Sequence, residues 1–337
     1  MMNESAIRAV LERYPRLIAD CERHKALGWY PSGGEVYKFA VRPSFEAVDR
    51  FADHVFGGIG FEPDDYMLGP TEFGIDGYGR RRPELSPEAQ ARHHAIFNNG
   101  LVLECRAIMK SSPGRIDDWT RLIGDDGRFG GIRLPFSVGS HQGLGTLHAL
   151  RMARRAITVS DLMRGHGRCV ATLVEIGGGH GRSLRDLIWM FGVETAFYTD
   201  LPLNMLLAAR FLGHFFGDRV NLVWSEDDAV VAGGINIIAP WLIDRIAVPV
   251  DLLVNFYSFQ HMSMEALRYY GDQLIKPRAA ALYHLNREQR RDSFDVAVPD
   301  YPFRDAFAVE DAAEFGVSKD GQNRVLSRIV GELMIRK

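Results

Sequence analysis

Seven residues near the middle of the chain could bind a small ligand: Glu175-Ile176-Gly177-Gly178-Gly179-His180-Gly181. An apolar run precedes them and a helical pattern follows, so these glycines are predicted to lie where a strand turns into a helix. Glycine lets the backbone approach a ligand closely, and a helix N-terminus favours a negatively charged group. A dinucleotide fingerprint, G-x-G-x-x-G, would need its third glycine where Arg182 or Leu184 stands. Dinucleotide binding is therefore weakly supported.

The same residues fit S-adenosylmethionine better, because an acidic residue stands two positions before a G-x-G-x-G series. The carboxylate of Glu175 suits the ammonium group of that cofactor, directly or through water. The backbone of the glycines is predicted to line the cofactor, at Gly177, Gly178, Gly179 and Gly181. The alternative is a glycine-rich turn that binds no ligand.

A second acidic residue stands where such a cofactor would need one. Asp200 lies 23 residues beyond Gly177 and ends the next predicted strand, a spacing at which an acid binds ribose hydroxyls. Asp200 could also cap the helix that Pro202 opens, and the two roles are compatible. Leu201 is expected beside the cofactor. Glu226, after a third predicted strand, could reach the adenine amino group or belong to an acidic surface loop.

A further predicted strand, Val250–Phe256, leads to the remaining candidates. Asn255 and Phe256 are predicted to contact the cofactor, and the residues expected at the acceptor are Tyr257, Ser258 and Gln260, although Tyr257 could instead belong to the core. His261 could remove the proton of a hydroxyl acceptor, since histidine has an ordinary pKa of ~6.5. A structural hydrogen bond at the start of a helix is an equally good account of His261.

Two residues before the predicted cofactor domain could also line the acceptor site. His141 and Gln142 lie in a glycine-bearing segment, although a helix N-terminal cap would explain them too. The neighbouring pair His93-His94 does not predict a metal site, because adjacent residues on a helix point in different directions. No metal is expected.

Alternating strands and helices must position these residues. Strands are predicted over 169–176, 195–199, 220–224, 250–256 and 279–285, with helices between them, and 236–239 is either a short strand or a loop. This alternation predicts an α/β fold: a Rossmann-like, mostly parallel sheet with helices on both faces. The segment 324–334 could add a last, antiparallel strand. Residues 1–165 are predicted to be a mainly helical region with helices near 4–27, 44–56, 86–110 and 141–164, and residues 166–337 form the cofactor domain.

Composition excludes several other classes of protein. The 337 residues carry 40 basic and 43 acidic side chains, a net charge of −3, so neither nucleic acid nor a membrane is an expected partner. Three scattered cysteines form no disulfide framework or zinc motif, and the N-terminus lacks a secretory signal pattern. We therefore expect a cytoplasmic protein with a small-molecule acceptor. Two copies could associate through the N-terminal helices.

The glycine motif, the Asp200-Leu201-Pro202 turn and the stretch from Asp251 through Ser258-Phe259-Gln260 resemble a bacterial family named for sugar O-methyltransferase activity. The resemblance covers about the last 170 residues and is loose before them. It implies the class I S-adenosylmethionine-dependent methyltransferase fold. Where that family has a glutamate after the glutamine, this chain has His261, and plant-type O-methyltransferases have a general-base histidine at a similar place.

These observations predict a methyltransferase that uses S-adenosylmethionine on a small molecule, such as a sugar or a secondary-metabolite intermediate. O-methylation by in-line displacement is the expected reaction, with His261 as the candidate base. One alternative keeps the cofactor but transfers or cyclises its aminocarboxypropyl arm, which releases methylthioadenosine. Another is a non-catalytic helper subunit with the same fold.

Overall fold

The computed structural model describes residues 4–24, 102–110, 112–124, 134–138, 141–145, 147–290, 296–319 and 325–337. The chain divides into two compact units: Met1–Arg42 together with Leu162–Lys337, and Pro43–Asp161. The second boundary is close to the one expected near residue 165, whereas the first helix groups with the C-terminal unit. The predicted helix over 44–56 and the pair His93-His94 lie outside the described residues.

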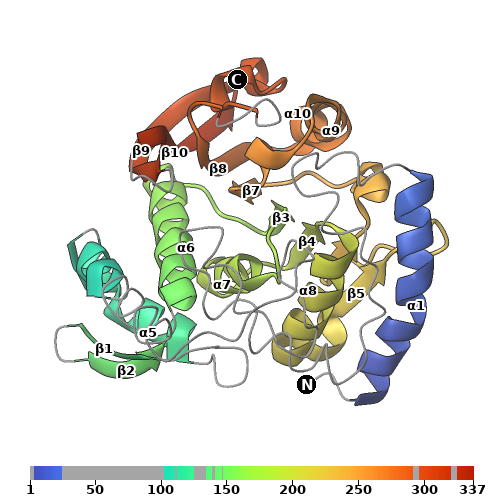
Figure 1. Ribbon diagram of the computed structural model, residues 1–337, viewed down its shortest axis with the longest axis horizontal. Coiled ribbons are helices and arrows are strands. Elements are labelled where there is room, and N and C mark those ends of the chain that lie inside the picture. Colours follow the sequence, from blue (N-terminus) through green and yellow to red (C-terminus); the bar gives the residue numbers. More distant parts are fainter. Residues whose placement is uncertain are drawn as a thin grey trace. The chain divides into compact units, whose positions relative to one another are not determined.

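The C-terminal unit contains an eight-stranded sheet in the order β5-β6-β4-β3-β7-β8-β10-β9 (Figure 1). Its strands are β3 (Thr172–Ile176), β4 (Thr195–Thr199), β5 (Val220–Val223), β6 (Ile235–Ile238), β7 (Leu252–Phe256), β8 (Ala281–Arg287), β9 (Phe307–Lys319) and β10 (Val325–Arg336). The first six pair in parallel, and β10 runs antiparallel to both β8 and β9. The predicted Rossmann-like, mostly parallel sheet and its antiparallel last strand are confirmed.

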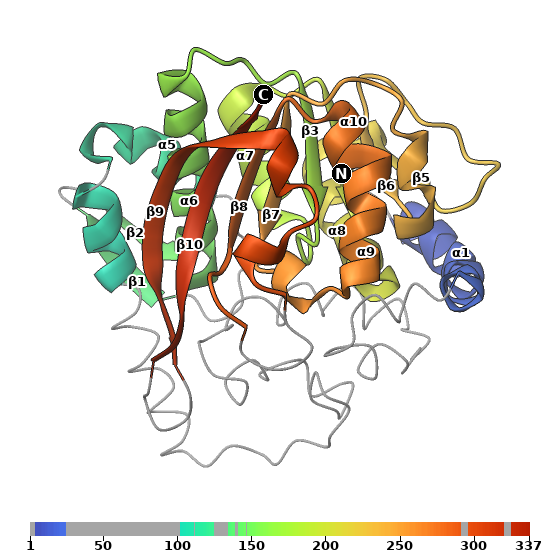
Figure 2. The same ribbon diagram turned by 90° about the horizontal axis from the view of Figure 1, so that it is seen from above.

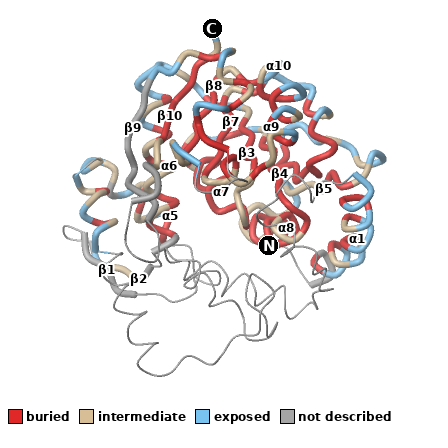
Figure 3. The backbone as a smooth tube through the Cα atoms, turned by 45° about the horizontal axis from the view of Figure 1, so that its top comes forward, coloured by how far each residue is buried: buried red, intermediate tan, exposed pale blue. Residues whose placement is uncertain are grey.

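Helices cover both faces of this sheet, as a parallel sheet requires. Figure 2 shows α9 (Met264–Tyr270) and α10 (Lys276–Arg278) on one face, and α7 (Arg182–Phe191) and α8 (Pro202–Phe216) on the other. The central strands β3, β6 and β7 are almost entirely buried, which explains their continuous apolar sequences (Figure 3). The crossover β3–α7–β4 proceeds to one side of β3, while β7 pairs with its other side. The strand order therefore reverses at β3 and β7, the place where open α/β sheets bind ligands.

Helix α1 (Glu4–Arg23) belongs to the same unit and packs against α8. Pro15 lies inside α1 without ending it. Helical backbone continues from α9 through the π-helical turn Gly271–Ile275 and α10, and it ends at Arg278, one residue after Pro277.

The unit Pro43–Asp161 contains a helix over 102–110, α5 (Ile116–Gly124), the hairpin of β1 (Leu134–Val138) and β2 (His141–Gly145), and most of α6 (Leu147–Gly165). The helix predicted over 141–164 is thus wrong in its first turns. Val138 pairs with His141 at the closed end of the hairpin, and Gly143 and Gly145 weaken a helix there. None of the helices in the described ranges is both long and apolar enough to span a membrane.

Candidate functional site

The glycine turn joins β3 to α7 at the reversal point of the sheet. Gly177 has a φ of 72°, in the left-handed region that favours glycine. A Cβ atom at Gly177 would overlap the Ser258 side chain, and one at Gly178 would overlap the Glu175 carboxylate. Gly177 and Gly178 therefore have no room for a side chain, because Ser258 and Glu175 pack directly against the turn. Gly181 precedes the first residue of α7 and supplies no side-chain cap to that helix.

The Glu175 carboxyl is completely buried beneath this turn. Ser183 Oγ donates a hydrogen bond to Glu175 Oε1, and the backbone N–H of Leu184 contributes another. Glu175 Oε2 has no hydrogen-bond partner among the residues that the structure describes. Burial, reinforced by the nearby charges of Asp200 and Asp186, raises the pKa of Glu175 to about 8. A buried carboxylate with a vacant acceptor oxygen is suited to a cationic group.

Asp200 is buried as well, but its oxygens are fully used. Oδ1 accepts from Leu201 N at 2.6 Å and Asn204 Nδ2 at 2.9 Å. Oδ2 accepts from Gly179 N at 2.9 Å and lies 3.1 Å from the Tyr198 hydroxyl. Burial raises the pKa of Asp200 in spite of these donors. Asp200 therefore fixes the glycine turn through Gly179 at the place where it could also receive ribose hydroxyls.

Tyr198 and Ser183 were not predicted as members of the site. The Tyr198 hydroxyl donates to the carbonyl oxygen of Gly179, so Tyr198 and Asp200 hold both polar groups of that one peptide residue. Tyr198 stands two residues before Asp200 on β4, and alternate strand residues share a face of the sheet. That spacing is the signal that could have revealed it.

Asn255 joins the carboxyl ends of three neighbouring strands. Its Nδ2 donates to Ile176 O at 2.7 Å and to Ser258 Oγ, and its Oδ1 accepts from Phe259 N at 3.1 Å and from Asn286 Nδ2 at 2.9 Å. These bonds tie β3, β7 and β8 together behind the glycine turn. Asn255 thus has a structural role that also brings Ser258 against the turn, where Ser258 Oγ lies 3.1 Å from Ile176 O.

The chain next to Asn255 is held in an unusual conformation. Tyr257 has a φ of 64°, the single non-glycine residue with a positive φ in the part of the chain described. Its N–H donates to Leu285 O at 2.8 Å, which holds the strained residue against β8. Backbone strain of this kind concentrates at functional sites and costs of order 1–3 kcal/mol. Phe256, just before it, is buried.

Gln260 orients His261. The Oε1 atom of Gln260 accepts from Arg287 N at 2.9 Å, which leaves its Nε2 to face His261 Nε2 at 3.0 Å. An amide nitrogen only donates, so His261 Nε2 accepts this hydrogen bond and the ring proton resides on Nδ1. His261 is partly exposed, whereas Gln260 is buried.

The other predicted residues lie in several places. Leu201 is buried and directly precedes α8. Glu226 is exposed in the loop after β5, which is the edge strand. His141 and Gln142 are on β2 in the unit Pro43–Asp161, with Gln142 exposed, and their role stays a prediction. Within the described ranges, no three histidine, cysteine, aspartate or glutamate side chains are grouped to hold a metal ion.

Comparison with known proteins gives distant structural likeness. No family model and no curated protein matches the chain, so the resemblance to sugar O-methyltransferases has no support beyond the motifs themselves. Among solved structures, magnesium protoporphyrin IX methyltransferase from Synechocystis PCC 6803 matches with bound SAM (TM-score 0.37, 11% identity, 69% of this chain and 95% of that chain). Its form with bound SAH matches with a TM-score of 0.39 and 10% identity, over 69% of this chain and 97% of that chain. TehB from Haemophilus influenzae matches with a TM-score of 0.38 and 12% identity, over 55% of this chain and 62% of that chain. At these scores the fold assignment rests on the strand order itself.

Proposed function

We propose that this protein is an S-adenosylmethionine-dependent methyltransferase that acts on a small hydroxylated molecule. The Glu175 carboxyl carries the proposal: it is buried under a glycine turn, at the reversal point of the sheet, with one acceptor oxygen vacant among the described residues. A phosphate-bearing dinucleotide would be repelled by a carboxylate there, whereas the ammonium of an amino-acid cofactor would supply the missing donors. The Asp200 carboxylate, directly beyond the turn, suits the ribose of the same cofactor.

The bound cofactor would supply an electrophilic methyl group on a positively charged sulfur. Its transfer to an acceptor hydroxyl would exchange the carbon–sulfur bond for a carbon–oxygen bond and would give S-adenosylhomocysteine, a methyl ether and one proton. The protein has to hold the acceptor oxygen in line, which can lower the barrier by roughly 7–11 kcal/mol. Asn255 and the strained Tyr257 fix the backbone at the end of β7, where the residues proposed to contact the acceptor lie.

His261 is the proposed base for the acceptor proton. The lone pair of His261 Nε2 accepts from Gln260 in the unliganded arrangement. An acceptor hydroxyl can take the place of Gln260 Nε2, because it is also a donor, and its proton then passes to His261 as the methyl group transfers. Binding of the acceptor must therefore displace the Gln260 amide from His261.

The proposal is tested by titrating the purified protein with S-adenosylhomocysteine in a calorimeter and by analysing turnover with a panel of sugars and phenols. Methyl transfer gives S-adenosylhomocysteine and an acceptor heavier by one methylene unit. Methylthioadenosine as the sulfur product would show attack on the aminocarboxypropyl arm instead. Absence of S-adenosylhomocysteine binding would refute both reactions and leave a non-catalytic protein.

A further inference from the structure

The segment that carries the proposed base is held by the end of the neighbouring strand, β8. Tyr257 N donates to Leu285 O at 2.8 Å, and Arg287 N donates to Gln260 Oε1 at 2.9 Å. Between these two contacts, the side-chain oxygen of Asn286 accepts from Gln260 N at 3.4 Å. Three consecutive residues of β8 therefore hold this segment, and Asn286 is the one that does so with its side chain.

Asn286 also reaches back to β7 and, through it, to the glycine turn. Its Nδ2 atom donates to Asn255 Oδ1 at 2.9 Å, and Asn255 Nδ2 donates to Ile176 O at 2.7 Å at the start of the turn. Asn286 is completely buried, and a buried amide lowers stability unless its polar atoms are hydrogen-bonded. Its donor side meets that condition on the way to the glycine turn, and its acceptor side meets it at Gln260.

Two buried amides cap the 3₁₀ turn Phe259–His261. The first N–H groups of a helical turn have no acceptor within it. Asn255 Oδ1 accepts from Phe259 N at 3.1 Å, and Asn286 Oδ1 accepts from Gln260 N. An apolar residue in place of Asn286 would remove this acceptor, and a buried N–H group without an acceptor is unfavourable. The turn would therefore shift, and the Gln260 amide would shift with it.

We infer that Asn286 is a positioning residue that couples the glycine turn to His261. The inference rests on the proposed function, which assigns the cofactor to the turn and the acceptor proton to His261. Asn286 acts through its two neighbours: it holds Asn255 behind the turn, and it holds Gln260 so that Gln260 Nε2 faces His261 Nε2. Loss of the Asn286 amide should therefore change both the cofactor affinity and the tautomer of His261.

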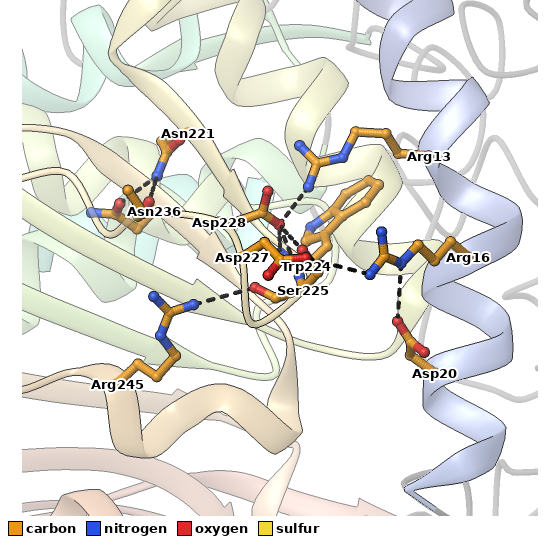
Figure 4. Close-up of polar contacts among 11 residues, drawn as sticks. Arg13, Arg16, Asp20, Asn221, Trp224, Ser225, Asp227, Asp228, Asn236 and Arg245 are labelled. Carbon is orange, nitrogen blue, oxygen red and sulfur yellow. Dashed lines mark hydrogen bonds and ion pairs between the residues drawn. The ribbon is translucent and has the colours of Figure 1, made fainter.

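Asn236 on β6 provides a matched control, because it is equally buried and belongs to the same sheet. Its Oδ1 atom accepts from Asn221 Nδ2 at 2.9 Å (Figure 4). Its side chain also bonds to both backbone groups of Val231, at 2.8 and 2.9 Å. None of these partners belongs to the glycine turn or to the segment after β7. Asn286→Leu and Asn236→Leu therefore each remove a buried amide, and only the first should affect the site.

Two measurements on the full chain test the inference. In calorimetric titrations with S-adenosylhomocysteine, Asn286→Leu should weaken binding about three- to tenfold, as loss of a buried hydrogen bond does, and Asn236→Leu should leave it unchanged. Nitrogen-15 NMR of histidine-labelled protein without ligand reports the tautomer, and His261→Gln identifies the His261 signal by its absence. The wild-type ring should carry its proton on Nδ1, and Asn286→Leu should shift the population toward the Nε2 tautomer.

Both changes in Asn286→Leu, with neither in Asn236→Leu, would support the inference. Wild-type affinity or a wild-type His261 spectrum in Asn286→Leu would overturn it, and so would equal changes in Asn236→Leu. Asn286→Val, which is smaller and suited to a strand, takes its place if Asn286→Leu does not fold, with the same outcomes. A wild-type protein that binds no S-adenosylhomocysteine refutes the proposed function, whereas the His261 spectrum, recorded without ligand, tests Asn286 separately.

Discussion

Cofactor binding should be coupled to ionisation of Glu175, and this coupling is measurable. Burial raises the pKa of the Glu175 carboxyl to about 8 in the unliganded protein, so the group is mostly protonated at neutral pH. An ammonium group beside Oε2 favours the ionised form. Binding of S-adenosylhomocysteine should therefore release a proton from Glu175 at every pH below about 8.

The size of the effect follows from the pKa. If the carboxyl is ionised in the complex, the dissociation constant falls by about tenfold per pH unit well below pH 8. Between pH 5 and pH 7 the affinity should rise by about 90-fold, which corresponds to about 2.7 kcal/mol. Calorimetric titrations at pH 5, 6 and 7 measure this slope. Titrations at pH 6 in buffers of different ionisation enthalpy should show the release of about one proton.

Three variants test the assignment to Glu175. Glu175→Gln should bind more weakly than wild type at pH 7 and lose the slope. Asp200→Asn should keep the slope, which separates Glu175 from the other buried carboxyl with a raised pKa. Glu194→Gln, an exposed control, should change neither affinity nor slope. An affinity of wild type that is flat from pH 5 to pH 7, or a slope that survives in Glu175→Gln, would refute the reasoning.

Three further predictions concern packing, catalysis and acid stability. Gly177→Ala should lower stability and cofactor affinity more than Gly192→Ala. Both glycines have a positive φ, but only at Gly177 would the new Cβ atom overlap a neighbouring side chain, that of Ser258. Thermal unfolding and calorimetry compare the two variants, and equal losses would contradict this account. Gln260→Glu should lower kcat by about 10²–10⁴-fold, because a carboxylate draws the ring proton of His261 to Nε2 and blocks His261 from acting as a base. Gln260→Ala should retain more activity. Similar values of kcat in the two variants would count against His261 as the base. His284 and Arg304 lower the pKa of Glu332 to about 2, so the stability that Glu332 contributes is present above pH 4.5 and is lost as the pH falls toward 2. In Glu332→Gln, the free energy of unfolding should fall less steeply with decreasing pH over this range. An unchanged pH dependence would exclude Glu332 as its origin.

The sequence predicted the parts of the fold that depend on local pattern. Buried parallel strands are continuous apolar runs, so β3, β4 and β7 could be found, and the glycine turn and Asp200 follow directly from their ends. The position of β6 could not be found in this way. Four apolar residues, Ile235–Ile238, are too few to distinguish a strand from a loop, and their pairing between β4 and β5 depends on contacts far apart in the chain.

The same limit applies to other segments. His141–Gly145 precedes a true helix without a proline to separate them, so a single helix was predicted where a hairpin strand comes first. The long edge strand β9 (Phe307–Lys319) was missed, because its apolar residues alternate irregularly with acidic ones and its pairing with β10 has breaks in register. Glu226 is exposed in the loop after the edge strand β5, and its contact with adenine stays a prediction.

Two acids at the ends of adjacent strands look equivalent in the sequence, yet the structure gives them different tasks. Asp200 has hydrogen-bond donors on both oxygens, and one of these bonds holds Gly179 in place. Ribose hydroxyls can bind Asp200 only by replacing one of these donors, and the Asn204 amide is the one on a neighbouring side chain that can rotate away. Glu175 retains a vacant oxygen and a raised pKa. Asp200 therefore shapes the site before the ligand arrives, while Glu175 becomes charged when the ligand binds. Loss of Asp200 should change the geometry of the turn, and loss of Glu175 should change the pH dependence of binding.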